Sequence, residues 1–190
     1  MKTKFHEKRK DDSHNLIIGV IGGTLLATGV AIYLKTRTIP FGVKAIKPFD
    51  VKKYLGKWYE VARLDYRSEK NLDNVTAEYS LNEDGTIKVV NSGYNYKKSV
   101  KEEVTGTAKF AGPKDEGKLK VSFWGPFYEG YNIIAIDKNY KYALIAGKNR
   151  NYLWILSRET SIPVDVKLAY LHKAKSLGFK IEKLIWSEHE

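Results

Sequence analysis

Apolar and polar residues alternate along most of the chain in short runs that are separated by turn residues. In one such run Val75, Ala77 and Tyr79 share a face, and residues 82–85 (Asn-Glu-Asp-Gly) then supply a hairpin turn. Alternation with period two is typical of strands that bury one face. Eight strands are expected in series, at residues 57–64, 75–81, 87–89, 104–110, 119–123, 131–137, 140–146 and 152–158. The pattern predicts an all-β fold, an eight-stranded antiparallel up-and-down β-barrel, because closure removes the exposed strand edges.

The last third of the chain changes its period. Pro163 can begin a helix, Val164, Leu168 and Leu171 recur at helical spacing, and Gly178 suits the C-terminal cap. Residues 181–186 then return to a strand pattern. We therefore expect a C-terminal α-helix packed outside the barrel, followed by a short last strand.

A hydrophobic segment precedes the barrel. Its nineteen residues, from Leu16 to Leu34, carry no charge, and as a helix they would span roughly 28 Å, about the thickness of a bilayer core. This length favours an uncleaved transmembrane signal anchor over a removed signal peptide. The expected organisation is a charged tail (1–15), a signal or anchor segment (16–34), a linker (35–48) and a barrel domain (49–190).

Composition excludes several classes of protein. The formal net charge is +11, yet no basic run is interleaved with aromatic residues, so nucleic-acid binding is not expected and anionic lipid surfaces are favoured instead. The chain has no cysteine, which excludes disulfides, thiol nucleophiles and Cys-linked lipid anchors. The four histidines show no ligand spacing, so neither a metal nor another cofactor is expected.

Two separated motifs resemble those of a known family. Gly56 and Trp58 form a G-x-W motif similar to the one that opens lipocalins, and Arg158 resembles the arginine that lipocalins place over that tryptophan. Residues 125–132 and 137–140 resemble the bacterial outer-membrane lipocalin (Blc) group, which is itself similar to apolipoprotein D. The resemblance runs over nearly the whole chain after the linker and implies a lipocalin barrel.

The physical chemistry of the two motifs agrees with a structural role. Trp58 would plug the closed end of the barrel, and Arg158 could stack on the indole while its guanidinium donates to nearby carbonyls.

One departure from the resemblance concerns membrane attachment. The bacterial group is usually acylated on a cysteine, and residues 25–29 look like the start of the required motif, but Val30 stands where the cysteine is needed. Attachment would then come from the segment Leu16 to Leu34 itself. This predicts a protein of the bacterial cell envelope with its barrel on the periplasmic or outer side, and leaves the choice of membrane and a homodimer open.

Strand alternation also predicts which residues meet a ligand. The face that carries Trp58 should look inward, with small side chains that leave room for an acyl chain. The candidate ligand-binding residues are Glu60, Ala62, Leu64, Ala77, Tyr79, Val89, Ala108, Phe110, Val121, Phe123, Tyr131, Tyr152 and Trp154. The alternative is a fully packed core, since all of these side chains would also serve as ordinary packing.

Charged residues near this face leave alternatives open. Glu60 could orient a ligand hydroxyl or be held in a structural bond, because an unpaired carboxylate inside a barrel is costly. Arg63, Arg67 and Lys70 lie near the first long loop, where they could meet an anionic head group or form a solvated rim.

The resemblance implies binding, storage or transport of a fatty acid or lysophospholipid, with no enzymatic activity. Two other functions stay open. One is a lipid-modifying enzyme that uses Glu60 or the tyrosines, since the strands offer neither Cys nor His as an activated group. The other is a structural envelope protein with a filled barrel that binds a protein partner.

Overall fold

The computed structural model describes residues 37–64 and 71–189. From Thr38 onward these residues belong to one compact unit. The expected tail and the hydrophobic segment 16–34 lie outside the described residues. Among the residues that are described, no helix has the length and apolar character needed to cross a membrane.

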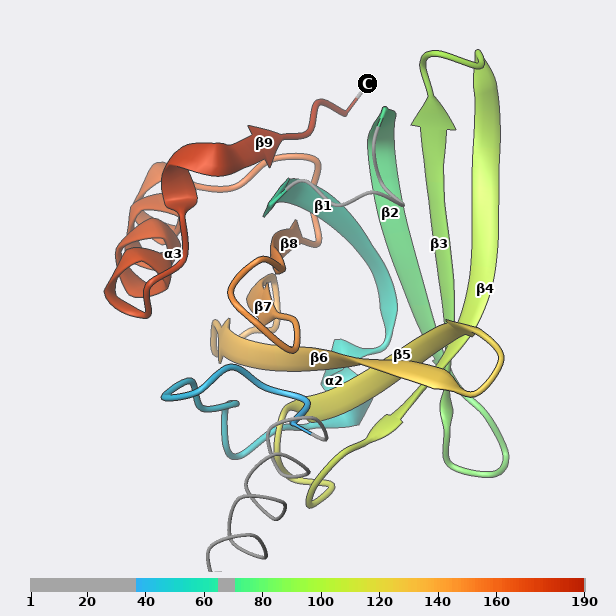
Figure 1. Cartoon of the computed structure of the whole chain (residues 1–190), viewed down its shortest axis with the longest axis vertical. Coiled ribbons are helices and arrows are strands. Elements are labelled where there is room, and N and C mark those ends of the chain that lie inside the picture. Colours follow the sequence, from blue (N-terminus) through green and yellow to red (C-terminus); the bar gives the residue numbers. More distant parts are fainter. Residues whose placement is uncertain (1–36, 65–70, 190) are drawn as a thin grey trace, which may run out of the picture. The chain divides into compact units, whose positions relative to one another are not determined.

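An antiparallel β-barrel forms the body of this unit (Figure 1). Each strand pairs with the next along the chain, and β1 closes the barrel by pairing with both β2 and β8. The expectation of an eight-stranded barrel is confirmed. Its strands are β1 (Gly56–Leu64), β2 (Leu72–Leu81), β3 (Ile87–Asn95), β4 (Val100–Phe110), β5 (Lys118–Trp124), β6 (Phe127–Ile136), β7 (Tyr142–Ala146) and β8 (Leu153–Ser157).

The C-terminal elements follow the sequence pattern closely. Helix α3 (Val164–Ser176) begins after Pro163, and Gly178 ends it with a φ of 82°, a left-handed conformation that favours glycine. A 3-10 turn (Ile181–Lys183) leads into the short strand β9 (Leu184–Trp186). The expected helix and last strand are therefore confirmed. A four-residue helix, α2 (Val51–Tyr54), was not expected.

Strand β9 adds to the wall where β1 separates from β2. The first half of β1 pairs with β2, whereas its last three residues pair with β9, with Ala62 opposite Trp186. The chain after β9 continues between β1 and β2. Ser187 donates its backbone N–H to the carbonyl of Val61 on β1, and the carbonyl of Glu188 accepts from the N–H of Asn74 on β2.

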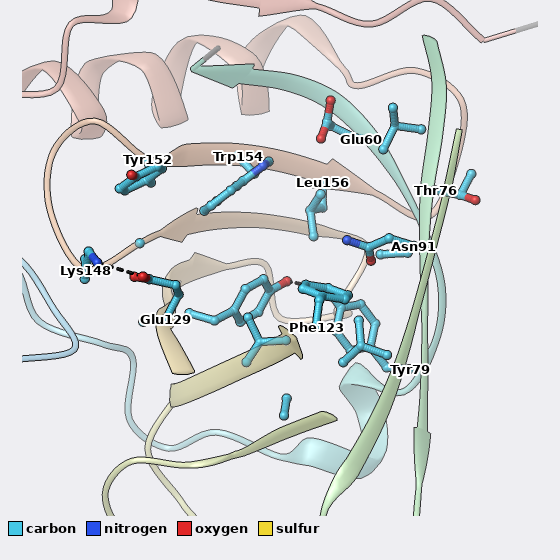
Figure 2. A pocket seen from close by; sticks show the side chains of 18 of the residues that line it. Glu60, Thr76, Tyr79, Asn91, Phe123, Glu129, Lys148, Tyr152, Trp154 and Leu156 are labelled. Atoms are coloured by element: carbon cyan, nitrogen blue, oxygen red, sulfur yellow. Dashed lines mark hydrogen bonds and ion pairs between the residues drawn. The ribbon is translucent and has the colours of Figure 1, made fainter. Parts of the chain in front are cut away.

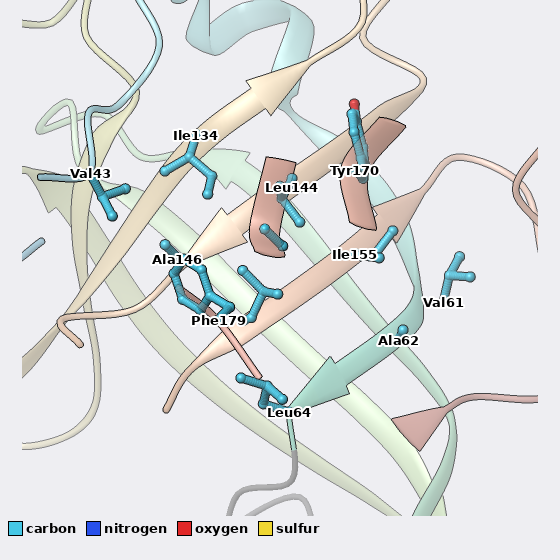
Figure 3. Close-up of a cluster of buried hydrophobic side chains, with 12 residues drawn as sticks. Val43, Val61, Ala62, Leu64, Ile134, Leu144, Ala146, Ile155, Tyr170 and Phe179 are labelled. Carbon is cyan, nitrogen blue, oxygen red and sulfur yellow. The ribbon is translucent and has the colours of Figure 1, made fainter. Parts of the chain in front are cut away.

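Two buried clusters lie on opposite faces of the barrel wall. The outer cluster fills the space between the wall and α3 (Figure 3). The inner cluster lies inside the barrel. Members of the outer cluster include Val43, Leu144, Leu153, Ile155, Tyr170 and Phe179, and members of the inner cluster include Trp58, Tyr79, Ile133, Ile145 and Leu156.

Residues 38–48, which the sequence indicates as linker, pack on the barrel. Val43 is buried in the outer cluster. Ile46 donates to the carbonyl of Ile133 and accepts from the N–H of Gly117 at its own carbonyl, with N···O distances of 2.8 and 2.9 Å. This segment is thus part of the compact unit.

A β-bulge in β1 changes which side chains face inward. Glu60 lies opposite Leu156 on β8, but the next aligned pair is Ala62 with Ile155, so one residue is skipped. Such a bulge reverses the alternation beyond it. Ala62 and Leu64 therefore join the outer cluster (Figure 3), contrary to the expectation that they face a ligand, and the intervening Arg63 turns inward.

Candidate ligand-binding site

Trp58 closes one end of the barrel. Its side chain is 0% exposed, and the indole Nε1 donates to the carbonyl of Tyr54 at 2.8 Å. The guanidinium carbon of Arg158 lies 3.9 Å from the centroid of the indole ring, as the sequence predicts for a cation–π contact. Arg158 also donates to the backbone carbonyls of Lys53, Tyr54, Leu55 and Lys57, at 2.6–3.0 Å.

Gly56 makes this arrangement compatible with the backbone. Its φ of 91° lies in the region that disfavours residues with a Cβ, and a Cβ there would lie 3.5 Å from Arg158 Nη1. The three motif residues Gly56, Trp58 and Arg158 thus form one structural plug.

Beyond the plug, the barrel encloses a pocket of about 410 Å³ (Figure 2). This volume lies in the range found for small-molecule sites. Strands β1 to β6 and β8 contribute to the lining, together with Gly147 and Lys148 after the end of β7. The lining residues are Glu60, Val75, Thr76, Ala77, Tyr79, Val89, Asn91, Ala108, Val121, Phe123, Trp124, Phe127, Glu129, Gly130, Tyr131, Gly147, Lys148, Tyr152, Trp154 and Leu156.

Most of the candidate residues from the sequence come together here. Ala62 and Leu64 do not, because of the bulge, and Phe110 lies at the inner cluster without reaching the pocket. Phe110 pairs with Leu119, where side chains fill the barrel interior. The candidates that do line the pocket are Glu60, Ala77, Tyr79, Val89, Ala108, Val121, Phe123, Tyr131, Tyr152 and Trp154.

Three phenols are linked beside the plug. The hydroxyl of Tyr131 lies 2.6 Å from that of Tyr54 and 2.7 Å from that of Tyr79. Burial raises the pKa of Tyr54 and Tyr131 well above the ordinary tyrosine value, so both phenols stay neutral. Tyr79 and Tyr131 present this chain of hydroxyls to the pocket.

Glu60 is held by a structural bond and also lines the pocket. Its Oε1 lies 2.6 Å from Arg63 Nη1, and the two side chains are 4% and 3% exposed. The hydroxyl of Ser187 donates to the same oxygen at 3.1 Å. Burial raises the pKa of Glu60, while the bonds from Arg63 and Ser187 oppose the rise because they stabilise the charged form. Arg63 is therefore a buried partner of Glu60 and does not belong to a solvated rim, whereas Arg67 and Lys70 lie outside the described residues.

Exposed side chains form the rim of the pocket. Trp124 and Phe127 pair across the hairpin between β5 and β6, and both are 77% exposed. Glu129 and Lys148 form an ion pair, with 2.7 Å between Oε1 and Nζ. In Figure 2 this pair lies at the left of the pocket and Thr76 at the right. Tyr152 stacks against Trp154, with ring planes 12° apart.

Several lining residues were not among the candidates. Asn91 follows Val89 by two residues, so the alternation of β3 predicts that its side chain points inward. It is polar, whereas Val89, the candidate on this strand, has an apolar side chain. Trp124, Phe127 and Lys148 lie at or beside turns, where strand alternation carries no information. Within residues 37–64 and 71–189, no group of His, Cys, Asp or Glu could hold a metal ion.

A small antiparallel barrel with one plugged end and one apolar pocket defines a class of proteins that enclose a single small ligand. The chain belongs to the lipocalin family, since the model of the lipocalin-like domain matches residues 49–189.

Relatives in bacteria and animals share much of the chain. It is 48% identical over 160 residues to the outer membrane lipoprotein Blc of Citrobacter freundii, covering 84% of this chain and 90% of the relative. It is 46% identical over 166 residues to the protein of the same name from Escherichia coli K12, covering 85% and 94%. Apolipoprotein D of Rattus norvegicus is 34% identical over 161 residues, covering 77% and 83%.

Solved structures support the fold alone. The cockroach allergen Per a 4 superposes with a TM-score of 0.64 at 21% identity, covering 81% of this chain and 96% of that one. Insecticyanin of the tobacco hornworm Manduca sexta also gives 0.64, at 22% identity, covering 81% and 88%.

Proposed function

We propose that this protein binds and carries a lipid-like apolar ligand, a fatty acid or a lysophospholipid, in the barrel pocket. The observation that carries the proposal is the 410 Å³ pocket enclosed by the barrel, in which aliphatic and aromatic side chains predominate. Burial of an acyl chain in such a pocket contributes about 0.8 kcal/mol for each methylene group removed from water. The lipocalin family and the relatives that are bacterial outer membrane lipoproteins support the same function.

The ligand contacts are assigned by position in the pocket. Val89, Ala108, Val121 and Phe123 supply apolar surface to the acyl chain. Trp154 on β8 supplies a large flat aromatic contact. The buried carboxylate of Glu60 is already engaged by Arg63, which supports binding rather than acid–base catalysis.

The place of action that we propose is the bacterial cell envelope. Relatives at 46–48% identity are named as outer membrane lipoproteins. This chain contains no cysteine for lipid attachment, so we assign the attachment to the hydrophobic segment from Leu16 to Leu34.

Displacement of a fluorescent fatty acid from the purified protein tests the pocket. We expect Trp154→Ala to weaken binding about tenfold or more, which corresponds to about 1.4 kcal/mol. Trp186→Ala is the matched control, because Trp186 lies on β9, away from the pocket, beneath the ammonium of Lys167 at 3.6 Å. Equal affinity of wild type and Trp154→Ala would remove Trp154 from the site.

Native mass spectrometry of the protein as isolated tests the function itself. A co-purified lipid that dissociates in organic solvent is the expected result. A barrel without lipid that also fails to bind any fatty acid or lysophospholipid would contradict the proposal.

A further inference from the structure

The two carboxylate oxygens of Glu60 have different surroundings. Both hydrogen bonds to the carboxylate, from Arg63 and from Ser187, end on Oε1. Oε2 accepts no hydrogen bond from any group within residues 37–64 and 71–189. Glu60 is 3% exposed and lines the pocket, and Figure 2 shows its carboxylate at the wall of the pocket.

Asn91 offers a second acceptor on the same wall. Its Oδ1 is buried and has no hydrogen-bond partner in the described part of the chain. A buried polar atom without a partner costs about 1–3 kcal/mol, so such atoms are usually satisfied by a ligand, a water or another side chain.

Strand register turns both acceptors towards the same pocket. Trp58 on β1 lies opposite Ala77 on β2, and Ala77 lies opposite Asn91 on β3. Glu60 follows Trp58 by two residues and therefore faces the same interior. Ala77 lines the pocket beside Asn91, and its small side chain leaves the space in front of Asn91 open.

We propose that Glu60 and Asn91 form a polar subsite that accepts hydrogen bonds from a hydroxyl-bearing head group of an otherwise apolar ligand. This inference rests on the proposed function and names its ligand class. Oε2 of a carboxylate and Oδ1 of an amide are both acceptors, so the complementary group must be a donor. Arg63 already compensates the charge of Glu60, which means that a neutral hydroxyl fits without a further counter-ion.

The inference separates two ligand classes that the pocket alone does not distinguish. A fatty acid is a carboxylate at neutral pH and has no proton to donate, and it would bring a second negative charge close to Glu60. A monoacyl glycerol lipid carries free hydroxyls next to its single acyl chain. The subsite therefore selects the hydroxyl-bearing lipid.

Three ligands with the same oleoyl chain test this on the full chain. Displacement of a fluorescent probe is measured with glycerol monooleate, which has two free hydroxyls, with methyl oleate, which has none, and with oleate. We expect glycerol monooleate to bind about tenfold or more tightly than methyl oleate, as one well-placed hydrogen bond allows. Oleate should bind no more tightly than methyl oleate.

Two substitutions locate the preference. Asn91→Leu keeps the size of the side chain, leaves Arg63 untouched and removes an acceptor, so it should fold and reduce the preference at least about threefold. Glu60→Gln keeps an oxygen for Arg63 and replaces the other acceptor by an amide, which can still donate to a hydroxyl oxygen, so its reduction should be smaller than that of Asn91→Leu. Glu102→Gln is the control, because Glu102 pairs with Lys98 at 2.8 Å and does not line the pocket, so its replacement should leave the preference unchanged.

The outcomes distinguish the two proposals. If all three ligands bind equally, or if Asn91→Leu does not reduce the preference, water fills the subsite and the inference is overturned while lipid binding stands. If none of the three ligands displaces the probe, the proposed function itself fails. Thermal melting of Glu60→Gln separates a loss of folding from a loss of binding, and Asn91→Leu decides the question on its own.

Discussion

Strands β7 and β8 bury residues on both faces, and the two faces have different packing. On the outer face Leu144 and Ile155 are 0% exposed and pack with Tyr170 of α3. On the inner face Trp154 and Leu156 border a 410 Å³ pocket. Strand β8 therefore supports a layer closed by a helix on one side and a layer with room for a ligand on the other, while the inner residues of β7, Ala143 and Ile145, are fully packed.

Polar groups on the two faces differ at the positions that matter for the pocket, although the buried Oδ1 of Asn132, outside the pocket lining, also has no partner in the described part of the chain. The hydroxyl of Tyr170 in the outer cluster donates to the carbonyl of Tyr142 at 2.8 Å. On the inner side Glu60 and Asn91 each keep an oxygen that no described group bonds. The outer layer and the plug therefore stabilise the barrel, while the pocket wall keeps hydrogen-bonding groups and volume for a ligand.

The plug gives the largest expected effect. Trp58→Ala removes a fully buried indole and the surface on which Arg158 stacks, so we expect a loss of about 3–5 kcal/mol in the free energy of unfolding. Urea denaturation measures it. Trp124→Ala, at a 77% exposed position, should stay within about 0.5 kcal/mol of wild type. A loss near 1 kcal/mol in Trp58→Ala would show that Trp58 is not the plug.

A matched pair of leucines tests the two faces directly. Leu144→Ala in the outer cluster should cost about 2–5 kcal/mol and leave the affinity for ligand unchanged, because Leu144 faces away from the pocket. Leu156→Ala should cost less stability, since its side chain already borders open space, and should change the affinity. Denaturation and probe displacement on both variants measure the four quantities. The reverse pattern would contradict the assignment of the two faces.

Alkaline pH probes the buried phenols of both clusters. Burial raises the pKa of Tyr170, and of Tyr54 and Tyr131, above the ordinary value near 10. Unfolded tyrosines lose their protons near pH 10 whereas these folded ones keep them, so above that pH the unfolded state binds fewer protons. The stabilisation is thus complete below about pH 10 and decreases as pH rises towards the folded pKa, by up to about 1.4 kcal/mol per pH unit for each tyrosine.

Denaturation curves on either side of pH 10 check this slope. Tyr170→Phe should reduce it by the share of one tyrosine and leave the phenols inside the barrel unaffected. A slope that is identical in wild type and Tyr170→Phe would show that Tyr170 titrates normally.

The smallest effect concerns the hydroxyl of Tyr79 among the three linked phenols. Tyr79→Phe removes a hydroxyl bonded to Tyr131 at 2.7 Å, and we expect a loss of about 0.5–1.5 kcal/mol. Thermal melting with and without bound lipid measures it. A cost above about 3 kcal/mol would mean that the packing around the ring, rather than the hydrogen bond, has changed.

The sequence predicts the barrel, the helix and the plug because these depend on local patterns. Period-two alternation, Pro163 before a helix and Gly178 after it each act within a few residues. The bulge after Glu60 has no such local signal, and it moves Ala62 and Leu64 to the outer cluster.

The sequence does not predict the pocket-lining role of polar side chains or of side chains near turns. Asn91 lies in the inward position of β3 although its amide is polar, since a ligand site tolerates polar groups that a packed core would not. Phe110 has the expected inward pattern but lies where the barrel interior is filled. The depth of the cavity depends on how distant side chains pack, and no single strand encodes it.

The way in which β1 closes the barrel has a consequence for the kinetics of folding. Arg158 bonds to the carbonyl of Lys57 across 101 positions of the chain, and β1 pairs with β8 over a similar separation. Contacts between such distant segments slow folding, because the intervening loop must lose its entropy first. We therefore expect the wall to close late, when β8 pairs with β1, and before that step both strands present unpaired edges to other chains. Dilute refolding conditions should accordingly favour the closed monomeric barrel over aggregation.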